Sequence, residues 1–384
     1  MDFYNMRTKD LKQGMIRAMF DRAASMSDVI SMGIGEPDMA TPAAICEAAK
    51  RALDEGVTHY TPNAGFLELR NTIAELSSIR NVGYDPGSEI IVTNGGMGAL
   101  SLLMAVILNP GDEVLVQDPQ WLNYVAQINY YGGVPVRVPT RGSQHFEMQA
   151  AEIESHITTR TKAIIVNSPN NPTGFVMRQS ALEDIARLAR KHNLLVISDE
   201  VYNTLLYDGQ KSKSIAEIPE MKDRTVVINS FSKAYAMTGW RIGYAAGPAS
   251  IIKRMTICQE NFNSCANAPG QYAAIYALRH PEICEELRCV FEKRRKLLLD
   301  GLRSVDGLSY EDSDGAFYVF PSIQSFGMDD VEFCNRLLSE EKVVCIPGSA
   351  FGACGAGYVR IAYTAREEIL LRALERIQKF CKTL

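Results

Sequence analysis

Lys233 lies in the segment of this chain whose residue types offer the most chemistry. Ser230 and Ser232 precede it, Arg241 follows it, and the apolar run 225–228 comes directly before. An amine that attacks a carbonyl needs a lowered pKa, and a neighbouring cation helps to lower it. An arginine and small hydroxyl donors suit a phosphate. The segment therefore predicts a lysine that forms a Schiff base with a phosphate-bearing aldehyde, although a lone Ser-Lys pair would more often be a solvated surface site.

Polar residues also follow the other predicted strands. Asn171 comes after one strand, and Asp199 and Tyr202 come after the next. Each alone also fits a turn, a helix cap or core packing. Together they suit one pyridine ring, because Asp199 could keep the ring nitrogen protonated while Asn171 and Tyr202 donate to a phenolic oxygen. With Trp121 to stack on the ring, the set predicts pyridoxal phosphate as the cofactor.

The phosphate of such a cofactor also needs backbone donors. Gly95, Gly96 and Met97 follow the predicted strand 90–93 and open a helix. Two glycines allow successive N–H groups to approach an anion, and the helix N-terminus adds a favourable dipole. The earlier Gly-Ile-Gly at 33–35 lacks the third glycine of a dinucleotide fingerprint, which argues against a nicotinamide dehydrogenase.

Composition excludes several other classes. The chain has 384 residues, 46% of them hydrophobic and 22% charged, with a formal net charge of −5 and no basic block that indicates nucleic acid or an anionic membrane. Its nine cysteines are irregularly spaced and its histidines number five, so no metal site is expected. The odd cysteine count favours a reducing cytoplasm. Residues 1–12 do not resemble a signal peptide, and no apolar run is long enough to span a bilayer.

Short apolar runs alternate with helical periods up to about residue 247, which predicts an α/β fold with a mostly parallel sheet. The predicted strands are 90–93, 113–117, 134–138, 162–166, 194–198 and 225–229, with helices at 98–108 and 180–192. Beyond residue 281 the pattern is α+β. It gives helices at 282–302, 330–341 and from 366, with strands at 316–320, 343–346 and 358–362. We expect a large domain of 43–280 and a small domain of 1–42 plus 281–384, with the N-terminal stretch packed on the C-terminal part.

Signature segments extend over nearly the whole chain. They are Gly-Ile-Gly-Glu-Pro-Asp at 33–38, His-Tyr-Thr-Pro-Asn-Ala-Gly at 59–65, Gly-Gly-Met at 95–97, Asn-Asn-Pro-Thr-Gly at 170–174, Asp-Glu-Val-Tyr at 199–202, the Lys233 segment 230–241, and Tyr-Val-Arg-Ile-Ala at 358–362. In these segments the chain resembles the fold type I aminotransferases of class I and II, most of all their aspartate/aromatic branch. The resemblance implies the fold of pyridoxal-phosphate-dependent transferases, in which a large domain has a mostly parallel seven-stranded sheet flanked by helices and the small domain is α+β.

The resemblance also implies a role for each matching residue. Lys233 would be the Schiff-base lysine and proton shuttle. Arg360 would clamp the α-carboxylate of the substrate, helped by Gly35, Asn171 and Trp121. The implied cofactor-binding residues are Tyr60, Gly95, Gly96, Met97, Trp121, Asn171, Asp199, Tyr202, Ser230 and Arg241. Tyr60 would reach the phosphate of a neighbouring subunit, which implies a homodimer with shared active sites.

The chain departs from the branch at Met97, where a lysine or serine is common and where only the backbone N–H could bind phosphate. A second cation, which dicarboxylate substrates require, has no motif here. Arg17 and the loop 261–267 are weak candidates for it.

The expected activity is ping-pong transfer of an amino group from an L-amino acid of the aspartate or aromatic type to a 2-oxo acid such as 2-oxoglutarate. A β-lyase that cleaves a carbon–sulfur bond on the same scaffold is the main alternative, because fold does not fix chemistry. A regulator with an aminotransferase-like module would need a DNA-binding segment, and the N-terminal 40 residues lack basic clustering.

Overall fold

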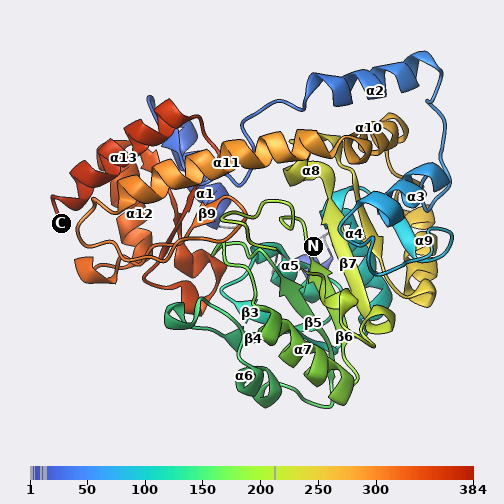
Figure 1. The fold of residues 1–384 in the computed structure, drawn as a ribbon. Coiled ribbons are helices and arrows are strands. Elements are labelled where there is room, and N and C mark those ends of the chain that lie inside the picture. Colours follow the sequence, from blue (N-terminus) through green and yellow to red (C-terminus); the bar gives the residue numbers. More distant parts are fainter. Residues whose placement is uncertain (1–2, 4, 9–10, 12–14, 212) are drawn as a thin grey trace.

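The computed structural model describes residues 3, 5–8, 11, 15–211 and 213–384. Its largest sheet has seven strands in the order β2-β8-β7-β6-β5-β3-β4 (Figure 1). β8 runs antiparallel to both of its neighbours, and the other pairings are parallel. The strands are β2 (Ile90–Thr93), β3 (Glu113–Asp118), β4 (Val134–Pro139), β5 (Thr161–Asn167), β6 (Leu195–Asp199), β7 (Thr225–Ser230) and β8 (Gly243–Ala246). The predicted α/β fold class is confirmed.

Helices bury both faces of this sheet, because successive strand side chains point to opposite sides. Ile91 packs with residues of α4, α5 and α9, whereas Ile90 and Val92 pack with residues of α2, α3 and α10. Ile164 and Val166 pack with residues of α6 and α7. The helices are α2 (Ala43–Asp54), α3 (Leu67–Leu76), α4 (Gly95–Ile107), α5 (Leu122–Tyr130), α6 (Ala150–Ser155), α7 (Gln179–Lys191), α8 (Phe231–Ala234), α9 (Ala249–Phe262) and α10 (Ala268–Arg279).

The C-terminal elements form a second core, together with α1 (Met15–Ala24) and β1 (Ile30–Ser31) from the N-terminal stretch. β1 pairs in parallel with β10, so this part of the N-terminal stretch lies against the C-terminal part. A three-stranded sheet has the order β11-β12-β9. The remaining elements are α11 (Pro281–Leu302), β9 (Tyr318–Val319), α12 (Asp330–Glu341), β10 (Val343–Val344), β11 (Ile346–Pro347), β12 (Val359–Ala362) and α13 (Glu367–Cys381).

Short 3-10 helices connect these elements. They are η1 (Met6–Thr8), η2 (Gly142–Gln144), η3 (Ile215–Glu217), η4 (Lys222–Arg224), η5 (Thr238–Trp240), η6 (Gln324–Phe326), η7 (Gly348–Phe351) and η8 (Ala353–Gly355). None of the helices in the described part of the chain is both long and apolar enough to cross a membrane.

The sequence missed β8 and misread one C-terminal strand. β8 is a four-residue segment, Gly-Tyr-Ala-Ala, with no alternation that marks a strand. The predicted strand 343–346 is two strands in different sheets, because β10 pairs with β1 and β11 pairs with β12. Strand β9 is shorter than the predicted 316–320. The division into 43–280 and 1–42 plus 281–384 stays a prediction, and the second core also includes Phe146, Phe175 and Tyr202.

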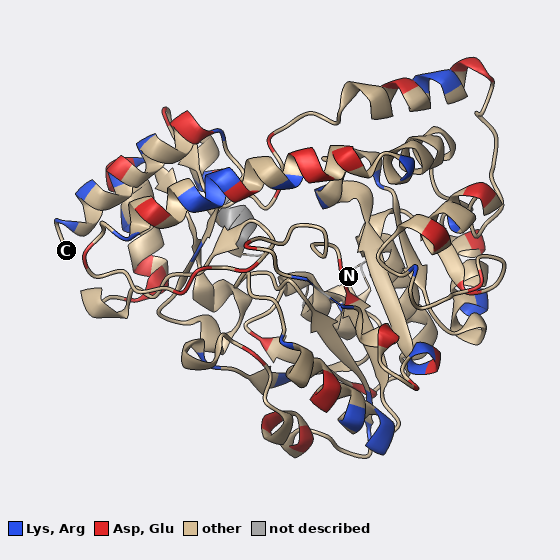
Figure 2. Cartoon of the chain, viewed as in Figure 1, with Lys and Arg blue, Asp and Glu red and all other residues tan. Residues whose placement is uncertain are grey.

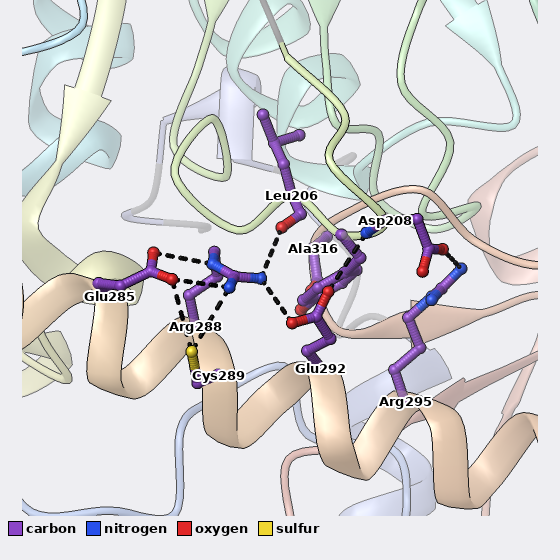
Figure 3. Close-up of polar contacts among 9 residues, drawn as sticks. Leu206, Asp208, Glu285, Arg288, Cys289, Glu292, Arg295 and Ala316 are labelled. Atoms are coloured by element: carbon purple, nitrogen blue, oxygen red, sulfur yellow. Dashed lines mark hydrogen bonds and ion pairs between the residues drawn. The ribbon is translucent and has the colours of Figure 1, made fainter.

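Helix α11 links the two parts of the molecule. Its first half is mainly acidic, and a basic run follows at 293–296 (Figure 2). Arg288 donates to Glu285 at 2.7 Å, to Glu292 at 2.9 Å and to the carbonyl of Leu206 at 3.2 Å (Figure 3). Arg295 pairs with Asp208 at 2.8 Å. These contacts connect α11 to the segment 206–208, which follows the Asp-Glu-Val-Tyr segment at 199–202.

Candidate active site

A cavity of about 320 Å³ lies at the carboxyl ends of the sheet strands, between the large sheet and the second core. β5 ends at Asn167, β6 at Asp199 and β7 at Ser230, so their last residues meet at one edge. Most residues predicted from the sequence line this cavity. They are Gly35, Gly96, Met97, Trp121, Asn171, Asp199, Tyr202, Ser230, Lys233, Arg241 and Arg360.

Lys233 reaches the cavity from α8, directly after β7. Its Nζ donates to the carbonyl oxygen of Gly35 at 2.7 Å. Burial lowers the pKa of this amine to about 8, the nearby Glu36 opposes the shift, and Arg241 and Arg360 add smaller contributions that lower it. The sequence argument that a neighbouring cation lowers the pKa of Lys233 is therefore confirmed, but burial, which the sequence did not show, is the larger cause.

Asp199 is buried at the end of β6 and has a partner that the sequence reasoning missed. The Tyr124 hydroxyl donates to its Oδ2 at 2.5 Å, and the Val201 N–H donates to its Oδ1 at 3.3 Å. Burial raises the pKa of Asp199 to about 6, while both hydrogen bonds lower it. Tyr124 follows Trp121 by one helical turn on α5, so the two rings meet edge to face at 5.2 Å. The three-residue spacing from Trp121 could have identified Tyr124 in the sequence, because residues three apart at a helix lie side by side.

Arg360 is 3% exposed on β12 and carries its charge among aromatic rings. Its guanidinium lies 4.5 Å from the ring centroid of Tyr318 and 4.8 Å from that of Phe351. Nη1 donates to Asn171 Oδ1 at 2.8 Å and Nη2 to the Gly33 carbonyl at 2.6 Å, whereas Nε is buried without a partner. Burial lowers the pKa of Arg360, but a guanidinium stays protonated. The described contacts of Arg360 include no carboxylate, so its charge is available to an anionic ligand.

Two further tyrosines meet at the cavity wall. The hydroxyls of Tyr202 and Tyr318 are 2.9 Å apart, and either oxygen can donate. Burial raises the pKa of Tyr202 well above its ordinary value, so this phenol stays protonated. Asn171 accepts from Arg360 through its side-chain oxygen, which leaves its amide N–H₂ to donate elsewhere.

The N-terminus of α4 forms the other end of the cavity. Gly95 has a φ of +73°, and a Cβ there would lie 2.6 Å from Arg241 Nη2, so glycine is required for the arginine to approach. Gly95 does not itself line the cavity. Ser230 caps α8, and its Oγ lies 2.8 Å from Ser232 Oγ. Unpaired N–H groups of a 13-residue helix, two hydroxyls and an arginine are the donor set that a phosphate requires.

The segment 33–36 closes the cavity from the N-terminal side. The carbonyls of Gly33 and Gly35 accept from Arg360 and Lys233, and the carbonyl of Ile34 accepts from Thr364 at 3.1 Å. Glu36 accepts a hydrogen bond from the Thr238 hydroxyl. Four consecutive residues therefore bind Lys233, Thr238 and Arg360, which line the cavity, and Thr364, which does not.

The remaining predicted positions are Tyr60, Met97 and the two candidates for a second cation. Tyr60 is 87% exposed and does not line the cavity. Met97 does, and its sulfur accepts from the amides of Asn123 at 3.5 Å and Gln127 at 3.6 Å. Of the two weak candidates for a second cation, the loop 261–267 contains no lysine or arginine, and the side chain of Arg17 lies outside the described part. Among the described residues, no three His, Cys, Asp or Glu side chains cluster as a metal would require.

Known proteins match this chain over almost its full length. The sequence profile of the family described as aminotransferase class I and II matches residues 27–377. An aspartate aminotransferase of Pyrococcus abyssi is 45% identical, covering 95% of this chain and 94% of that protein. An aromatic-amino-acid aminotransferase of Thermococcus litoralis is 43% identical, over 96% and 95%. The solved aspartate aminotransferase of Thermus thermophilus with maleate has a TM-score of 0.93 and 39% identity, with 100% of both chains covered.

Proposed function

The chain belongs to the class I and II aminotransferases, and from that membership we propose that it moves the amino group of an L-amino acid to a 2-oxo acid with pyridoxal phosphate. The observation that carries the proposal is the meeting of Lys233 and Arg360 in one cavity whose far end can bind a phosphate. When bound there, pyridoxal phosphate supplies an aldehyde that exchanges for the amino group and a ring that withdraws electrons from the substrate Cα.

The residues present fit this cofactor. The N-terminus of α4, Ser230 and Arg241 would hold its phosphate, and Asp199 would face its ring nitrogen. Tyr202 and the free amide N–H₂ of Asn171 would donate to its phenolic oxygen, and Trp121 would cover one face of its ring. The Tyr124 hydrogen bond supports the role of Asp199, because it opposes the rise in pKa that burial causes and so favours the carboxylate.

The protein side chains divide the reaction between them. Arg360 would bind the substrate α-carboxylate through its unpaired edge and orient the bond from Cα to hydrogen. Lys233, with a pKa near 8, would remove the proton from Cα of the amino acid. In the half-reaction with the oxo acid, it would return a proton to Cα. Two such half-reactions, first with the amino acid and then with the oxo acid, give a ping-pong sequence.

The proposed donor is of the aspartate or aromatic type, and the proposed acceptor is 2-oxoglutarate. One of the two relatives above is named an aspartate aminotransferase and the other an aromatic-amino-acid aminotransferase, which supports a donor of either type. The described cations that line the cavity are Lys233, Arg241 and Arg360, and each already has a proposed role.

The protein is further proposed to work as a homodimer in the cytoplasm. Tyr60 is exposed, as a residue that serves the site of a second subunit would be in one chain alone. The nine cysteines are free thiols, which suits a reducing compartment.

Loading the purified protein with pyridoxal phosphate and reducing it with borohydride tests the cofactor. Mass spectrometry should find the added mass on the peptide that contains Lys233. The Lys233→Ala variant should gain no mass and should not turn over, whereas Lys253→Ala, an exposed site on α9, should behave as wild type. A protein that gains no mass, or gains it only elsewhere, would refute the proposal.

A panel of L-amino acids with 2-oxoglutarate tests the reaction. Glutamate should form in proportion to the oxo acid of the donor. Pyruvate and ammonia from cysteine without any added oxo acid would instead identify the β-lyase.

Mixing two inactive variants tests the shared site. Tyr60→Ala and Lys233→Ala subunits should be weak or inactive alone. After dissociation and reassociation together they should regain activity, because the hybrid dimer has one site with both native residues. Mixed variants that stay as inactive as the separate samples would contradict shared sites.

A further inference from the structure

Tyr318 lies where the cofactor side and the substrate side of the cavity meet. It belongs to β9, which pairs with β12, the strand of Arg360, in the register Tyr318 to Ala362. Its side chain is 1% exposed and lines the cavity. None of the signature segments in the sequence includes this residue.

The hydroxyl of Tyr318 contacts the cofactor side. It lies 2.9 Å from the hydroxyl of Tyr202, and the two rings meet edge to face at 5.8 Å. If Tyr318 donates to the oxygen of Tyr202, the proton of Tyr202 is free to point into the cavity. Hydrogen bonds in such a chain strengthen one another. Tyr202 then becomes a better donor to any anionic oxygen that it meets there.

The ring of Tyr318 contacts the substrate side. The Arg360 guanidinium lies 4.5 Å from its centroid, a distance at which a buried cation is attracted to the face of an aromatic ring. Phe351 provides a second ring at 4.8 Å, and together they fix the plane of the guanidinium without neutralising its charge. A carboxylate in the place of these rings would compete with a substrate carboxylate for the same donors.

The third neighbour of Tyr318 is Gly35. A Cβ at position 35 would lie 2.0 Å from the Tyr318 hydroxyl oxygen, so only glycine admits the hydroxyl at this place. The Gly35 carbonyl in turn accepts from Lys233. Tyr318 therefore contacts Tyr202 and Arg360 directly, and it contacts Gly35, which binds Lys233. The proposed reaction uses Tyr202, Arg360 and Lys233.

We infer that Tyr318 is a positioning residue with two separable actions: its hydroxyl strengthens Tyr202 as a donor to the cofactor, and its ring orients Arg360 for the substrate carboxylate. The inference rests on the proposed function and deepens it. The charged and titratable groups that act on Tyr202 are Tyr318, Arg360 and Asp199. Of these, only Tyr318 contacts its hydroxyl among the described hydrogen bonds.

Two variants separate the two actions. Tyr318→Phe keeps the ring and removes the hydroxyl, and Tyr318→Leu removes both. With pyridoxal phosphate bound, the pH midpoint of the visible absorbance should move up by about 0.3 unit or more in Tyr318→Phe. The reason is that Tyr202 becomes a weaker donor, so the phenolic oxygen of the cofactor keeps more negative charge and holds the titrating proton more tightly. The Kd of 3-phenylpropionate, a carboxylate that cannot react, should stay within about twofold of wild type in Tyr318→Phe and rise about tenfold in Tyr318→Leu.

Tyr363→Phe is the matched control, since it removes a buried hydroxyl from the same core without lining the cavity. It should leave both the midpoint and the Kd unchanged. If thermal unfolding shows that Tyr318→Leu does not fold, pentafluorophenylalanine at position 318 replaces it, because this residue keeps the ring shape and reverses the charge on its face. The same rise in Kd is then expected.

Each outcome decides one action. An unchanged midpoint in Tyr318→Phe overturns the action through Tyr202, and an unchanged Kd in Tyr318→Leu or the fluorinated protein overturns the action through Arg360. A wild-type protein that binds no pyridoxal phosphate would refute the proposed function instead, and the carboxylate Kd, measured by calorimetry, would still test the action on Arg360.

Discussion

The Tyr124 hydroxyl donates to the Asp199 carboxylate at 2.5 Å, across 75 positions of sequence. This bond counters the burial that raises the pKa of Asp199 to about 6. It therefore sets how much of the buried carboxyl is ionised near neutral pH, and the proposed pairing with a protonated ring nitrogen requires the ionised form.

Removing this hydrogen bond should raise the pKa of Asp199 further. In Tyr124→Phe more of the carboxyl is protonated at a given pH, so the acidic limb of kcat/KM against pH should move up by about one unit. Tyr131→Phe is a matched control at the end of the same helix, because its hydroxyl bonds to Ser101 and not to a carboxylate. Identical pH profiles for wild type and Tyr124→Phe would contradict this function of Tyr124.

Arg360 should not be replaceable by lysine. Arg360→Lys keeps a positive charge but loses the planar fork and the stacking on Tyr318 and Phe351. We expect the KM for amino acids to rise about a hundredfold in Arg360→Lys and at least as much in Arg360→Ala. Steady-state kinetics would measure the change, with Arg372→Lys on the exposed face of α13 as control. A rise of less than about threefold in Arg360→Ala would be incompatible with a carboxylate clamp.

Gly35→Ala should damage the site by displacing Tyr318. The added Cβ would lie 2.0 Å from the Tyr318 hydroxyl oxygen and 3.0 Å from the ring carbon that bears it. Such overpacking costs about 1–3 kcal/mol of stability and should raise the KM about tenfold.

The double variant Gly35→Ala/Tyr318→Phe should recover part of the lost stability and part of the lost substrate affinity, because it removes the Tyr318 hydroxyl oxygen, the atom closest to the added Cβ. Gly239→Ala is the control, since no atom lies within 4 Å of its added Cβ. Losses in the double variant that equal the sum of those in the two single variants would show that the two positions do not interact.

Glu200 should make the stability of the protein depend on pH. Burial raises its pKa from 4.5 to about 7, against hydrogen bonds from Ser214 and Ser198 that lower it. Because the folded-state pKa lies above the unfolded value, the stability that Glu200 contributes is present below about pH 4.5 and is lost as pH rises through about 7.

Glu200→Gln should remove that loss. Its free energy of unfolding, relative to wild type, should rise by roughly 1–3 kcal/mol between about pH 5 and about pH 8. Urea unfolding at the two pH values measures this difference. Glu260→Gln, at an exposed position on α9, should show none. An equal difference from wild type at both pH values would mean that Glu200 titrates alike in the folded and unfolded chains.

Residues that follow a strand could be placed from sequence, because the direction of a parallel strand fixes where its last residue lies. Asn171, Asp199 and Lys233 were located in this way, and the structure brings them to one cavity. Their assigned roles remain predictions. Tyr318 could not be found, because its importance comes from contacts with Tyr202, Arg360 and Gly35, which only the folded chain brings together.

The cause of the lowered Lys233 pKa could not be predicted either. Sequence showed Arg241 nearby, but the larger effect is the enclosure of the amine by protein, to which Glu36 adds an opposing charge. Enclosure depends on how the N-terminal stretch packs against the rest of the molecule. Strand β8 was missed for a simpler reason, because its four residues carry too little pattern to separate a strand from a loop.

The hydrogen bond between the Gly33 carbonyl and Arg360 joins residues 327 positions apart. A ribosome adding about 5–20 residues per second leaves an interval of roughly 15–65 s between the synthesis of these two partners. During that time the segment 33–36 has been made but the arginine that it will bind has not. The nascent chain therefore acquires the proposed substrate-binding pocket only at the end of translation, and a chain that terminates before residue 360 cannot form it at all.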